Sequence, residues 1–230
     1  MVILPLHWDS AFFGLRIAKV EVRAQEDIHN LLAKEDSIRK LYDLLYVFAE
    51  PGLRWPLGKI RLADQKAVFT METSPQPELS RSIRRWQSSC ITDELKQLAL
   101  TSGKQSRFKL DSHFPVGSYE RLYSHWIEQS VNHTIATDVF CFFEADLPIG
   151  LATLNYDKEN SQIGLVAVHE DYQQRGIGLS LMRFVIDYTC RNQGKHLSVV
   201  TQLDNVAACR LYQKSGFSLA SVTEVRHWWL

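Results

Sequence analysis

The chain has 230 residues, of which 45% are apolar and 23% charged, the balance of an ordinary globular protein. Lysine plus arginine and aspartate plus glutamate both number 26, so no net field draws the chain to nucleic acid or to an anionic membrane. No basic region followed by a long apolar run opens the chain, and no apolar stretch is long enough to span a bilayer. We therefore expect neither a secretion signal nor a membrane segment, and one large domain or two small ones.

The four cysteines, at positions 90, 141, 190 and 209, are spread along the chain without a C-x-x-C pair. Metal-ligand spacing is therefore absent, and a disulfide framework is not expected in a chain of this length. We predict reduced, mostly structural cysteines in a cytoplasmic protein that holds no metal.

Residues 1–85 form the first of two expected regions. Leu44–Ala49 is an apolar run that predicts a strand, and it ends at the turn signal Glu50-Pro51-Gly52. Ala67–Met71 predicts a second strand. Thr73–Ser82 is rich in proline and serine and predicts a linker. This region carries no motif to which we can attach chemistry.

Residues 86–230 form the second region, and their hydrophobic periodicity predicts most of its elements. A helix over Ile91–Leu100 is followed by an irregular loop over Gln105–Gly117. Ser118 is expected to cap the next helix, whose apolar residues recur at helical spacing. This stripe comprises Tyr119, Leu122, Tyr123, Trp126 and Ile127.

The remaining elements alternate strands with helices, which predicts an α+β chain whose middle is a crossover unit. The expected elements are a hairpin of Val139–Phe143 and Gly150–Leu154, a strand over Ile163–Val168 covered on both faces, a helix over Ile177–Arg191, a strand over Leu197–Gln202, a helix capped by Asp204 or Asn205 with Gly216 as its left-handed end, and a strand over Phe217–Val225.

The most informative stretch is Gly164-Leu-Val-Ala-Val-His-Glu-Asp-Tyr-Gln-Gln-Arg-Gly-Ile-Gly178, where a buried strand runs into a turn and then into a helix. Gly176 and Gly178 allow the backbone to approach a ligand closely. Free N–H groups at the helix start and the positive end of its dipole favour a diphosphate, and Arg175 can add a full charge beside it. The two glycines alone also fit an ordinary strand-to-helix turn.

Residue types exclude two other phosphate-binding loops. A dinucleotide fingerprint requires a third glycine where Leu181 stands, and a Walker loop requires a Gly-Lys-Ser/Thr run that is missing. A nucleotide-hydrolysing domain is therefore disfavoured.

The surrounding residues are more specific. Gln173–Gly178 follows an apolar strand and precedes, 27 residues after Gly178, the run Asn205-Val-Ala-Ala-Cys-Arg-Leu-Tyr212-Gln-Lys-Ser-Gly-Phe217. Over roughly residues 90–230 this pairing of motifs resembles the GCN5-related N-acetyltransferase (GNAT) family. The resemblance implies a mixed sheet flanked by helices, acetyl-CoA as cosubstrate, and transfer of its acetyl group to an amine.

The resemblance also implies roles for individual residues. The strand before the turn separates from its neighbour and hydrogen-bonds the pantetheine arm, and the turn holds the pyrophosphate. Asn205 contacts the coenzyme arm, and Tyr212 faces the thioester sulfur as the catalytic residue. The other coenzyme-binding positions implied are Val166, Ala167, Val168, Gln173, Gln174, Arg175, Gly176, Ile177 and Gly178.

The chemistry of Tyr212 suits that role. Attack of an amine on a thioester expels a thiolate, which leaves more easily when a donor hydrogen-bonds the sulfur. A thiol and a phenol differ by about 1.5 pKa units, or roughly 2 kcal/mol, so full protonation by an ordinary tyrosine is mildly uphill. Spacing alone also fits a core aromatic on one stripe with Ala208 and Leu211.

A narrower resemblance is carried by Leu6-His-Trp-Asp-Ser-Ala-Phe-Phe-Gly14, Ser106-Arg-Phe-Lys-Leu-Asp111 and Leu122-Tyr-Ser-His-Trp-Ile127. These segments are similar to bacterial dTDP-fucosamine acetyltransferases, which acetylate the 4-amino group of a dTDP-4-amino-4,6-dideoxygalactose for surface polysaccharide synthesis. The resemblance implies a nucleotide sugar as the acceptor and a first region that is a partial GNAT-like domain, ahead of the coenzyme-binding domain over 86–230.

The loop before the amphipathic helix is a candidate acceptor site. Arg107 and Lys109 can pair with a diphosphate, and Phe108, Phe114 or Tyr119 can stack on a base or a sugar. The same residues fit a solvated loop with a few buried aromatics equally well.

A general base is harder to place. Glu144 at the hairpin edge can act through water, His133 and His169 are weaker candidates, and bulk water can take the proton. Neither Cys190 nor Cys209 has a histidine partner in sequence, so direct transfer in a ternary complex is favoured over an acyl-cysteine route.

The acceptor amine is left open by the sequence. A protein N-terminus, a polyamine and a small drug-like amine are alternatives to the nucleotide sugar. A non-catalytic acyl-CoA sensor is an alternative of another class, against which Tyr212 and Asn205 argue. The oligomeric state, a homodimer included, is also left open.

Overall fold

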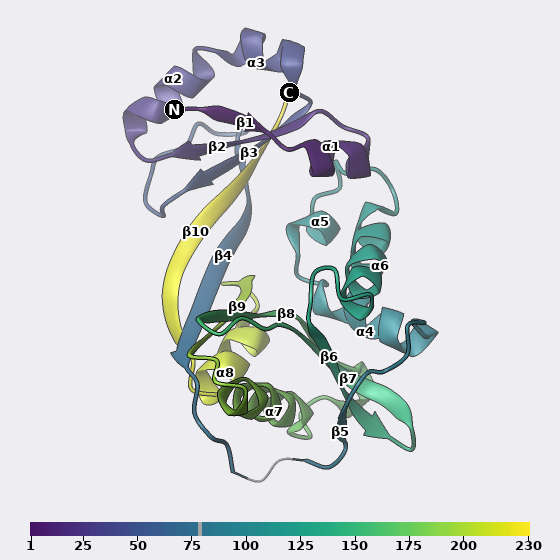
Figure 1. Cartoon of the computed structure of the whole chain (residues 1–230). Helices are drawn as coiled ribbons and strands as arrows, with labels where there is room; N and C mark the ends of the chain where they lie inside the picture. The colour runs from purple at the N-terminus through teal and green to yellow at the C-terminus, as the bar shows by residue number, and fades with distance from the viewer. Residues whose placement is uncertain (78–79) are drawn as a thin grey trace.

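The computed structural model describes residues 1–77 and 80–230, and within them one ten-stranded sheet carries helices on both faces (Figure 1). The strand order across the sheet is β1-β2-β3-β10-β4-β9-β8-β7-β6-β5. The pairs β2–β3 and β8–β9 are parallel, whereas the other neighbouring pairs are antiparallel. The predicted α+β class with a mixed sheet is confirmed.

The elements expected in the second region are present, several with longer bounds. The strands are β1 (Ile3–Pro5), β2 (Ile17–Val22), β3 (Leu44–Ala49), β4 (Arg61–Glu72), β5 (Ile83–Arg85), β6 (Asp138–Glu144), β7 (Leu147–Asn155), β8 (Asn160–Val168), β9 (His196–Gln202) and β10 (Ser218–Trp229). The helices are α1 (His7–Phe13), α2 (Gln25–Leu32), α3 (Glu35–Leu41), α4 (Asp93–Ser102), α5 (Arg107–Leu110), α6 (Ser118–Val131), the 3₁₀ turn η1 (Glu170–Tyr172), α7 (Ile177–Arg191) and α8 (Val206–Lys214).

Strands β4 and β10 join the two ends of the sheet. Each is 12 residues long; β10 pairs with β3 and β4, and β4 pairs in turn with β9. In Figure 1 they run from the strands near the two termini down to the part of the sheet that α7 and α8 cover. Because one sheet continues through both regions, side chains of residues 1–85 can lie beside those of the coenzyme-binding segment.

Three apolar clusters hold the helices on the sheet. Leu98 of α4 and Leu122 of α6 are fully buried on one side, and Leu181 of α7 is fully buried on the other. Leu31 of α2 lies in a third cluster over β2 and β3. Burying one such side chain contributes about 1.5–3 kcal/mol, so these clusters fix where the helix ends lie.

Two local expectations about the segment before α6 were wrong. Ser118 does not cap α6; the N-cap residue is Gly117, whose φ is 78°, and Ser118 is the buried first residue of the helix. A residue with a Cβ is disfavoured at that φ, so glycine suits this position. The expected irregular loop 105–117 contains α5, which is four residues long and too short to show a periodicity.

The expectation that β8 is covered on both faces was also wrong. Ile163, Leu165 and Ala167 are buried, but the residues that alternate with them are exposed or half-buried. Gly164, Val166 and Val168 are among these accessible residues, and they belong to the site described below.

The segment between β4 and β5 includes the expected linker, 73–82. Residues 73–77 have no helix or strand, and residues 78 and 79 lie outside the described residues. The N–H of Thr73 donates to the carbonyl of Lys195 (2.9 Å), and the N–H of Gln76 donates to Asp187 Oδ1 of α7 (3.1 Å).

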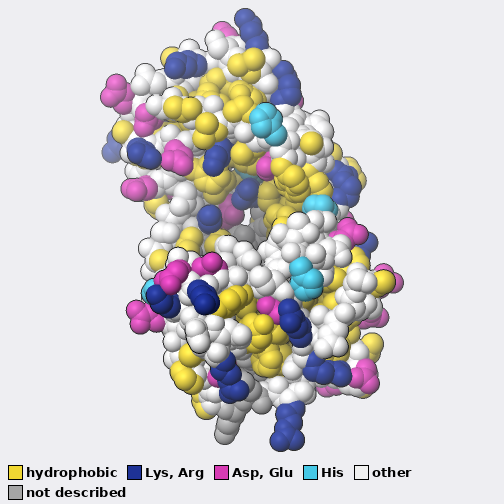
Figure 2. Space-filling view, viewed as in Figure 1, with side chains coloured by type: hydrophobic (Ala, Val, Ile, Leu, Met, Phe, Trp, Pro, Cys, Tyr) yellow, Lys and Arg dark blue, Asp and Glu magenta, His cyan; other side chains and the backbone are white. Residues whose placement is uncertain are grey.

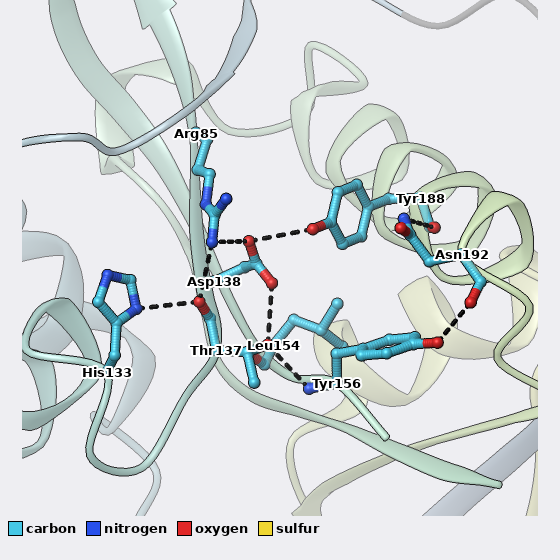
Figure 3. Close-up of polar contacts among 8 residues, drawn as sticks. All are labelled: Arg85, His133, Thr137, Asp138, Leu154, Tyr156, Tyr188 and Asn192. Carbon is cyan, nitrogen blue, oxygen red and sulfur yellow. Dashed lines mark hydrogen bonds and ion pairs between the residues drawn. The ribbon is translucent and has the colours of Figure 1, made fainter. Parts of the chain in front are cut away.

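A buried polar cluster fixes the C-terminal half of α7 (Figure 3). Asp138 is 2% exposed, pairs with Arg85 (2.7 Å), and accepts hydrogen bonds from Thr137 (2.8 Å) and from Tyr188 of α7 (3.2 Å). The hydroxyl of Tyr156 donates to a carbonyl just beyond the helix. A buried carboxylate is tolerated only when its charge is paired, and here its partners come from β5 and α7. The cluster therefore holds the C-terminal half of α7 against β5 and β6.

Candidate active site

Strands β8 and β9 separate midway along their length. Their parallel register runs from Asn160–His196 to Ile163–Val199, whereas β8 stays paired with β7 as far as Val168. The edge of residues 164–168 that faces β9 is thus available to pair with an extended ligand, as a strand would. The side chain of Gln173 already donates to the carbonyl of Val168 (3.1 Å).

The turn after β8 exposes backbone amides at the start of α7. Gln174 and Gly176 have φ of 62° and 81°. No side chain among the described residues caps α7, and its first internal bond runs from the N–H of Ser180 to the carbonyl of Gly176 (3.0 Å). The N–H groups of residues 177–179 therefore point out of the positive end of the helix dipole. A Cβ placed on Gly176 would meet no atom within 4 Å, so the space beside the turn is open.

The end of β8, this turn and α8 line a cavity of about 580 Å³, which we call the cofactor cavity. Arg175 is the one predicted coenzyme-binding residue that does not line it. Its guanidinium donates instead to the carbonyl of Asp171 (2.9 Å) and lies 4.9 Å from the ring centroid of Tyr172. The predicted residues that do line the cavity are Val166, Ala167, Val168, Gln173, Gln174, Gly176, Ile177, Gly178, Asn205 and Tyr212.

Positive charge reaches the cofactor cavity from α8. Arg210 and Lys214 line it, and neither was predicted as a coenzyme-binding residue. A helix N-terminus and two cations together suit phosphate groups, so the residues present fit coenzyme A. Spacing on α8 provides the missing signal: residues 207, 210, 211 and 214 share one helical face.

Asn205 and Tyr212 stand at the inner end of the cofactor cavity. Asn205 is the N-cap residue of α8, and its Oδ1 accepts the N–H of Ala208 (3.2 Å), which leaves its NH₂ donors for a ligand. Tyr212 is 4% exposed, and its ring packs against Phe69 of β4 at 5.7 Å. Burial raises the pKa of Tyr212, with a smaller contribution from Cys209, so the phenol is a neutral hydrogen-bond donor.

A second cavity of about 370 Å³, which we call the acceptor cavity, lies between the separated strands and α5. Figure 2 shows the molecule hollowed at mid-height, with acidic and basic side chains beside the opening. The two cavities meet, because they have five lining residues in common. These are Ser102, Val166, Asn205, Ala208 and Tyr212.

Two of the four predicted substrate residues line the acceptor cavity. Arg107 and Phe108 line the acceptor cavity, whereas Lys109 and Tyr119 line neither cavity. The ammonium of Lys109 pairs with a glutamate of α6 in solvent (3.3 Å), and the buried hydroxyl of Tyr119 donates to a carbonyl of α4. Phe114 is buried behind the cavity wall, with its ring centroid 5.5 Å from that of Phe108.

Asp64 of β4 lines the acceptor cavity and was missed by sequence reasoning. Its side chain is 5% exposed; Oδ2 lies 3.8 Å from Arg107 Nη1, and Oδ1 has no hydrogen-bond partner among the described residues. Burial raises the pKa of Asp64, while Arg107 opposes that rise. Asp64 reaches this cavity because β4 pairs with β9.

Other lining groups give the acceptor cavity a mixed character. The hydroxyl of Ser106 and the Nε–H of Arg107 are buried and, within the described residues, have no hydrogen-bond partner. Phe48, Phe108 and Trp126 supply aromatic surface. Buried polar groups without partners are rare, so a polar ligand that bears both donors and acceptors suits this cavity.

The other base and nucleophile candidates lie elsewhere. Glu144 is exposed at the end of β6 and lines neither cavity. His133 Nδ1 lies 2.9 Å from the carbonyl of Thr137, and His169 accepts the N–H of Asp171 (3.3 Å) as the N-cap residue of η1. Burial raises the pKa of Cys209, which makes it a poor nucleophile.

The described residues contain no helix that is both long and apolar enough to cross a membrane. They also hold no cluster of three or more metal-ligating side chains.

The chain is similar to known acetyltransferases. A model of the acetyltransferase (GNAT) family matches residues 105–217. The dTDP-fucosamine acetyltransferase of Escherichia coli O6:H1 (strain CFT073) is 26% identical over 242 residues, which cover 98% of this chain and 96% of that protein. The spore coat polysaccharide biosynthesis protein SpsD of Bacillus subtilis (strain 168) is 25% identical over 138 residues, or 60% of this chain and 47% of that protein.

Solved structures share the fold. A GCN5-related N-acetyltransferase from Sphaerobacter thermophilus has a TM-score of 0.60 at 14% identity, over 98% of this chain and 75% of that one. The chain belongs to the GNAT family of acetyl-CoA-dependent acetyltransferases. The resemblance found in the sequence is confirmed.

Proposed function

We propose that this chain acetylates the amino group of a nucleotide-linked amino sugar by direct transfer from acetyl-CoA in a ternary complex. The meeting of the two cavities at Tyr212 carries the proposal, because it lets a donor and an acceptor reach one point from opposite sides. The Escherichia coli relative, similar over nearly the whole chain, is a dTDP-fucosamine acetyltransferase. That similarity supports a dTDP-4-amino-4,6-dideoxygalactose as the acceptor.

The donor side follows from the lining of the cofactor cavity. Acetyl-CoA supplies the acetyl group as a thioester. The open edge of Val166–Val168 would pair with its pantetheine arm, and the amides of residues 177–179 would hold its diphosphate. Arg210 and Lys214 add charge for the phosphates, and Asn205 offers its amide to the arm.

The acceptor amine has to lose a proton before it can attack. Asp64 is placed to take it, because it presents a buried carboxylate oxygen without a partner in the acceptor cavity. Its raised pKa brings it closer to that of an ammonium group than an ordinary aspartate would be, which makes proton transfer easier. We assign the proton-accepting role to Asp64 in place of Glu144.

Tyr212 serves the leaving group. Tyr212 lines both cavities, and its hydroxyl would donate a hydrogen bond to the sulfur as negative charge develops there. Because burial raises its pKa further above that of a thiol, a hydrogen bond is favoured over complete proton transfer.

The acceptor cavity also favours a sugar over other amines. Phe48 and Phe108 offer flat apolar surface, and Ser106 and Arg107 offer buried polar groups without partners. A pyranose has apolar C–H faces and several hydroxyl groups, so it can satisfy both kinds of surface. A polyamine has charges but no hydroxyl groups, and it would leave the polar groups unpaired.

Thiol release from acetyl-CoA tests the proposal against its alternatives. The acceptors are dTDP-4-amino-4,6-dideoxygalactose, spermidine and a short peptide with a free N-terminus. We expect kcat/KM for the sugar to exceed the others by about 100-fold or more, because unpaired polar groups penalise the wrong acceptor. Equal or faster reaction of another amine would contradict the sugar, and binding of acetyl-CoA without turnover on any amine would favour a sensor.

A further inference from the structure

Asp111 lies at the C-terminal end of α5, the helix whose first residues, Arg107 and Phe108, line the acceptor cavity. Its Oδ2 accepts the indole N–H of Trp229 (2.9 Å) and lies 2.5 Å from Nδ1 of His227. Both partners are on β10, so this carboxylate joins the acceptor-side segment to the C-terminal end of a sheet strand.

The other carboxylate oxygen of Asp111 contacts His113, two residues further along the chain. Oδ1 accepts the backbone N–H of His113 (3.1 Å) and lies 2.8 Å from Nδ1 of the same histidine. Burial opposes ionisation of Asp111, but the hydrogen bonds from His227, Trp229 and His113 together hold its pKa well below the ordinary value. Burial lowers the pKa of His227, so a neutral ring donates its Nδ1–H to the charged carboxylate.

The same strand end also supports Arg107. The ring of His227 stacks on that of Tyr46 at 5.1 Å, and these two residues are cross-strand partners of β10 and β3. The guanidinium carbon of Arg107 lies 5.1 Å from the ring centroid of Tyr46. Phe114, beyond the helix, packs edge-on against His227 at 5.6 Å. Residues 107–114 are therefore held by contacts to β3 and β10 at several points.

A one-turn helix needs such support, because isolated short helices are unstable in water. α5 has few contacts of its own on the solvent side, where Lys109 reaches Glu120 at 3.3 Å between two half-exposed side chains. Exposed ion pairs of this kind contribute little, so they cannot fix the helix. The half-buried carboxylate of Asp111 adds hydrogen bonds from His113, His227 and Trp229 at the end of α5, beside the packing of Phe108 in the core.

We infer that Asp111 and His227 are positioning residues for the acceptor: they hold α5 against the end of β10, so that Arg107 and Phe108 keep their places in the wall of the acceptor cavity. The inference rests on the proposed function for its kinetic consequence. Arg107 faces Asp64 at 3.8 Å in the same cavity, so a displaced α5 weakens the binding of the acceptor there. No residue of α5 lines the cofactor cavity, so we expect the affinity for acetyl-CoA to be unaffected.

A double-mutant cycle with dTDP-4-amino-4,6-dideoxygalactose tests this coupling. Asp111→Ala should raise the KM for the sugar about tenfold, with kcat changed by about twofold at most and the Kd of acetyl-CoA unchanged. In an Arg107→Ala background, Asp111→Ala should change the KM by no more than about twofold, because residues that act through one another are not additive. Asp111→Asn, which still accepts the bond from Trp229, should have a smaller effect. Glu120→Ala removes the α6 partner of Lys109 on the solvent side of α5 and should leave all three constants unchanged.

Hydrogen exchange tests the anchoring without turnover. Asp111→Ala should speed amide exchange in residues 106–114 and leave residues 173–180 unchanged. Equal protection of residues 106–114 in the two proteins would overturn the inference, as would a full, additive effect of Asp111→Ala in the Arg107→Ala background. If the wild-type chain turns over no sugar, the proposed function fails, and the exchange measurement still decides whether Asp111 anchors α5.

Discussion

Asp64 and Arg107 face each other across the acceptor cavity with Oδ2 and Nη1 3.8 Å apart, while the other carboxylate oxygen of Asp64 stays buried without a partner among the described residues. The distance is long for a tight ion pair, and neither group is fully compensated by the other. A cation or a hydrogen-bond donor that enters the site would therefore stabilise the carboxylate of Asp64. The acceptor ammonium is such a group.

Asp64→Asn should therefore lower kcat/KM for the sugar at neutral pH by about 100-fold, the scale of a lost general base. The amide can neither take the proton nor balance the ammonium. Activity should recover in part at high pH, where the amine is already neutral in solution. A full pH–rate profile of both proteins checks this, with Asp36→Asn on exposed α3 as the matched control. A variant that keeps wild-type activity at neutral pH would remove Asp64 from the mechanism.

The same substitution should stabilise the empty protein at neutral pH. Burial raises the folded-state pKa of Asp64 above its unfolded value, so ionised Asp64 destabilises the fold at every pH above that folded pKa. The difference between the proteins should shrink as pH falls from the folded pKa to the unfolded pKa, and it should vanish below the unfolded pKa. We expect Tm to rise by about 2–4 °C at pH 7, which corresponds to about 1 kcal/mol in a chain of this size. A lower Tm for the variant at pH 7, measured by calorimetry, would be the contrary result.

Tyr212→Phe should reduce turnover by about tenfold or more and leave the affinity for acetyl-CoA nearly unchanged, because the hydroxyl acts on the leaving sulfur only as charge develops. The ring remains to pack against Phe69. Tyr156→Phe removes a hydroxyl that bonds a carbonyl beyond α7, away from both cavities, and serves as the control. Kinetics combined with calorimetric titration measure both quantities. Unaltered turnover would exclude Tyr212 as the donor.

Gly176→Val should weaken acetyl-CoA binding by about tenfold or more, for two reasons. The φ of Gly176 is 81°, which a β-branched residue adopts only under strain, so the amides of the turn would shift. The new side chain would also enter the open space beside the turn. Gly58→Val introduces a similar strain at φ of 84° away from both cavities, and it should leave the affinity unchanged. Retained affinity in the Gly176 variant would argue against the turn as the diphosphate site.

The coenzyme-binding side was predictable from sequence because its residues are contiguous. Strand, turn and helix follow one another from Gly164 to Arg191, and Asn205 and Tyr212 belong to the next helix. The spacing of these residues in the sequence therefore predicts which of them lie together. Arg175 does not line the cavity because its guanidinium contacts the carbonyl of Asp171 and the ring of Tyr172 within the same turn. The spacing of residues in the sequence does not predict either contact.

The acceptor side was not predictable in the same way, because the sheet assembles it from distant segments. Asp64 lies in the polar half of β4, where charged and apolar residues do not alternate cleanly, so only Ala67–Met71 was predicted as a strand. Its place in the cavity depends on the pairing of β4 with β9, which no local pattern encodes. The bond between Asp111 and His227 joins residues 116 positions apart for the same reason.

A crystal structure of the chain with acetyl-CoA would test the central claim most directly. We expect the diphosphate to lie on the amides of residues 177–179 and the pantetheine arm to pair with the open edge of β8. We also expect the sulfur to lie within hydrogen-bond reach of the Tyr212 hydroxyl, facing the acceptor cavity. Coenzyme bound elsewhere, or a thioester turned away from the junction of the two cavities, would contradict it.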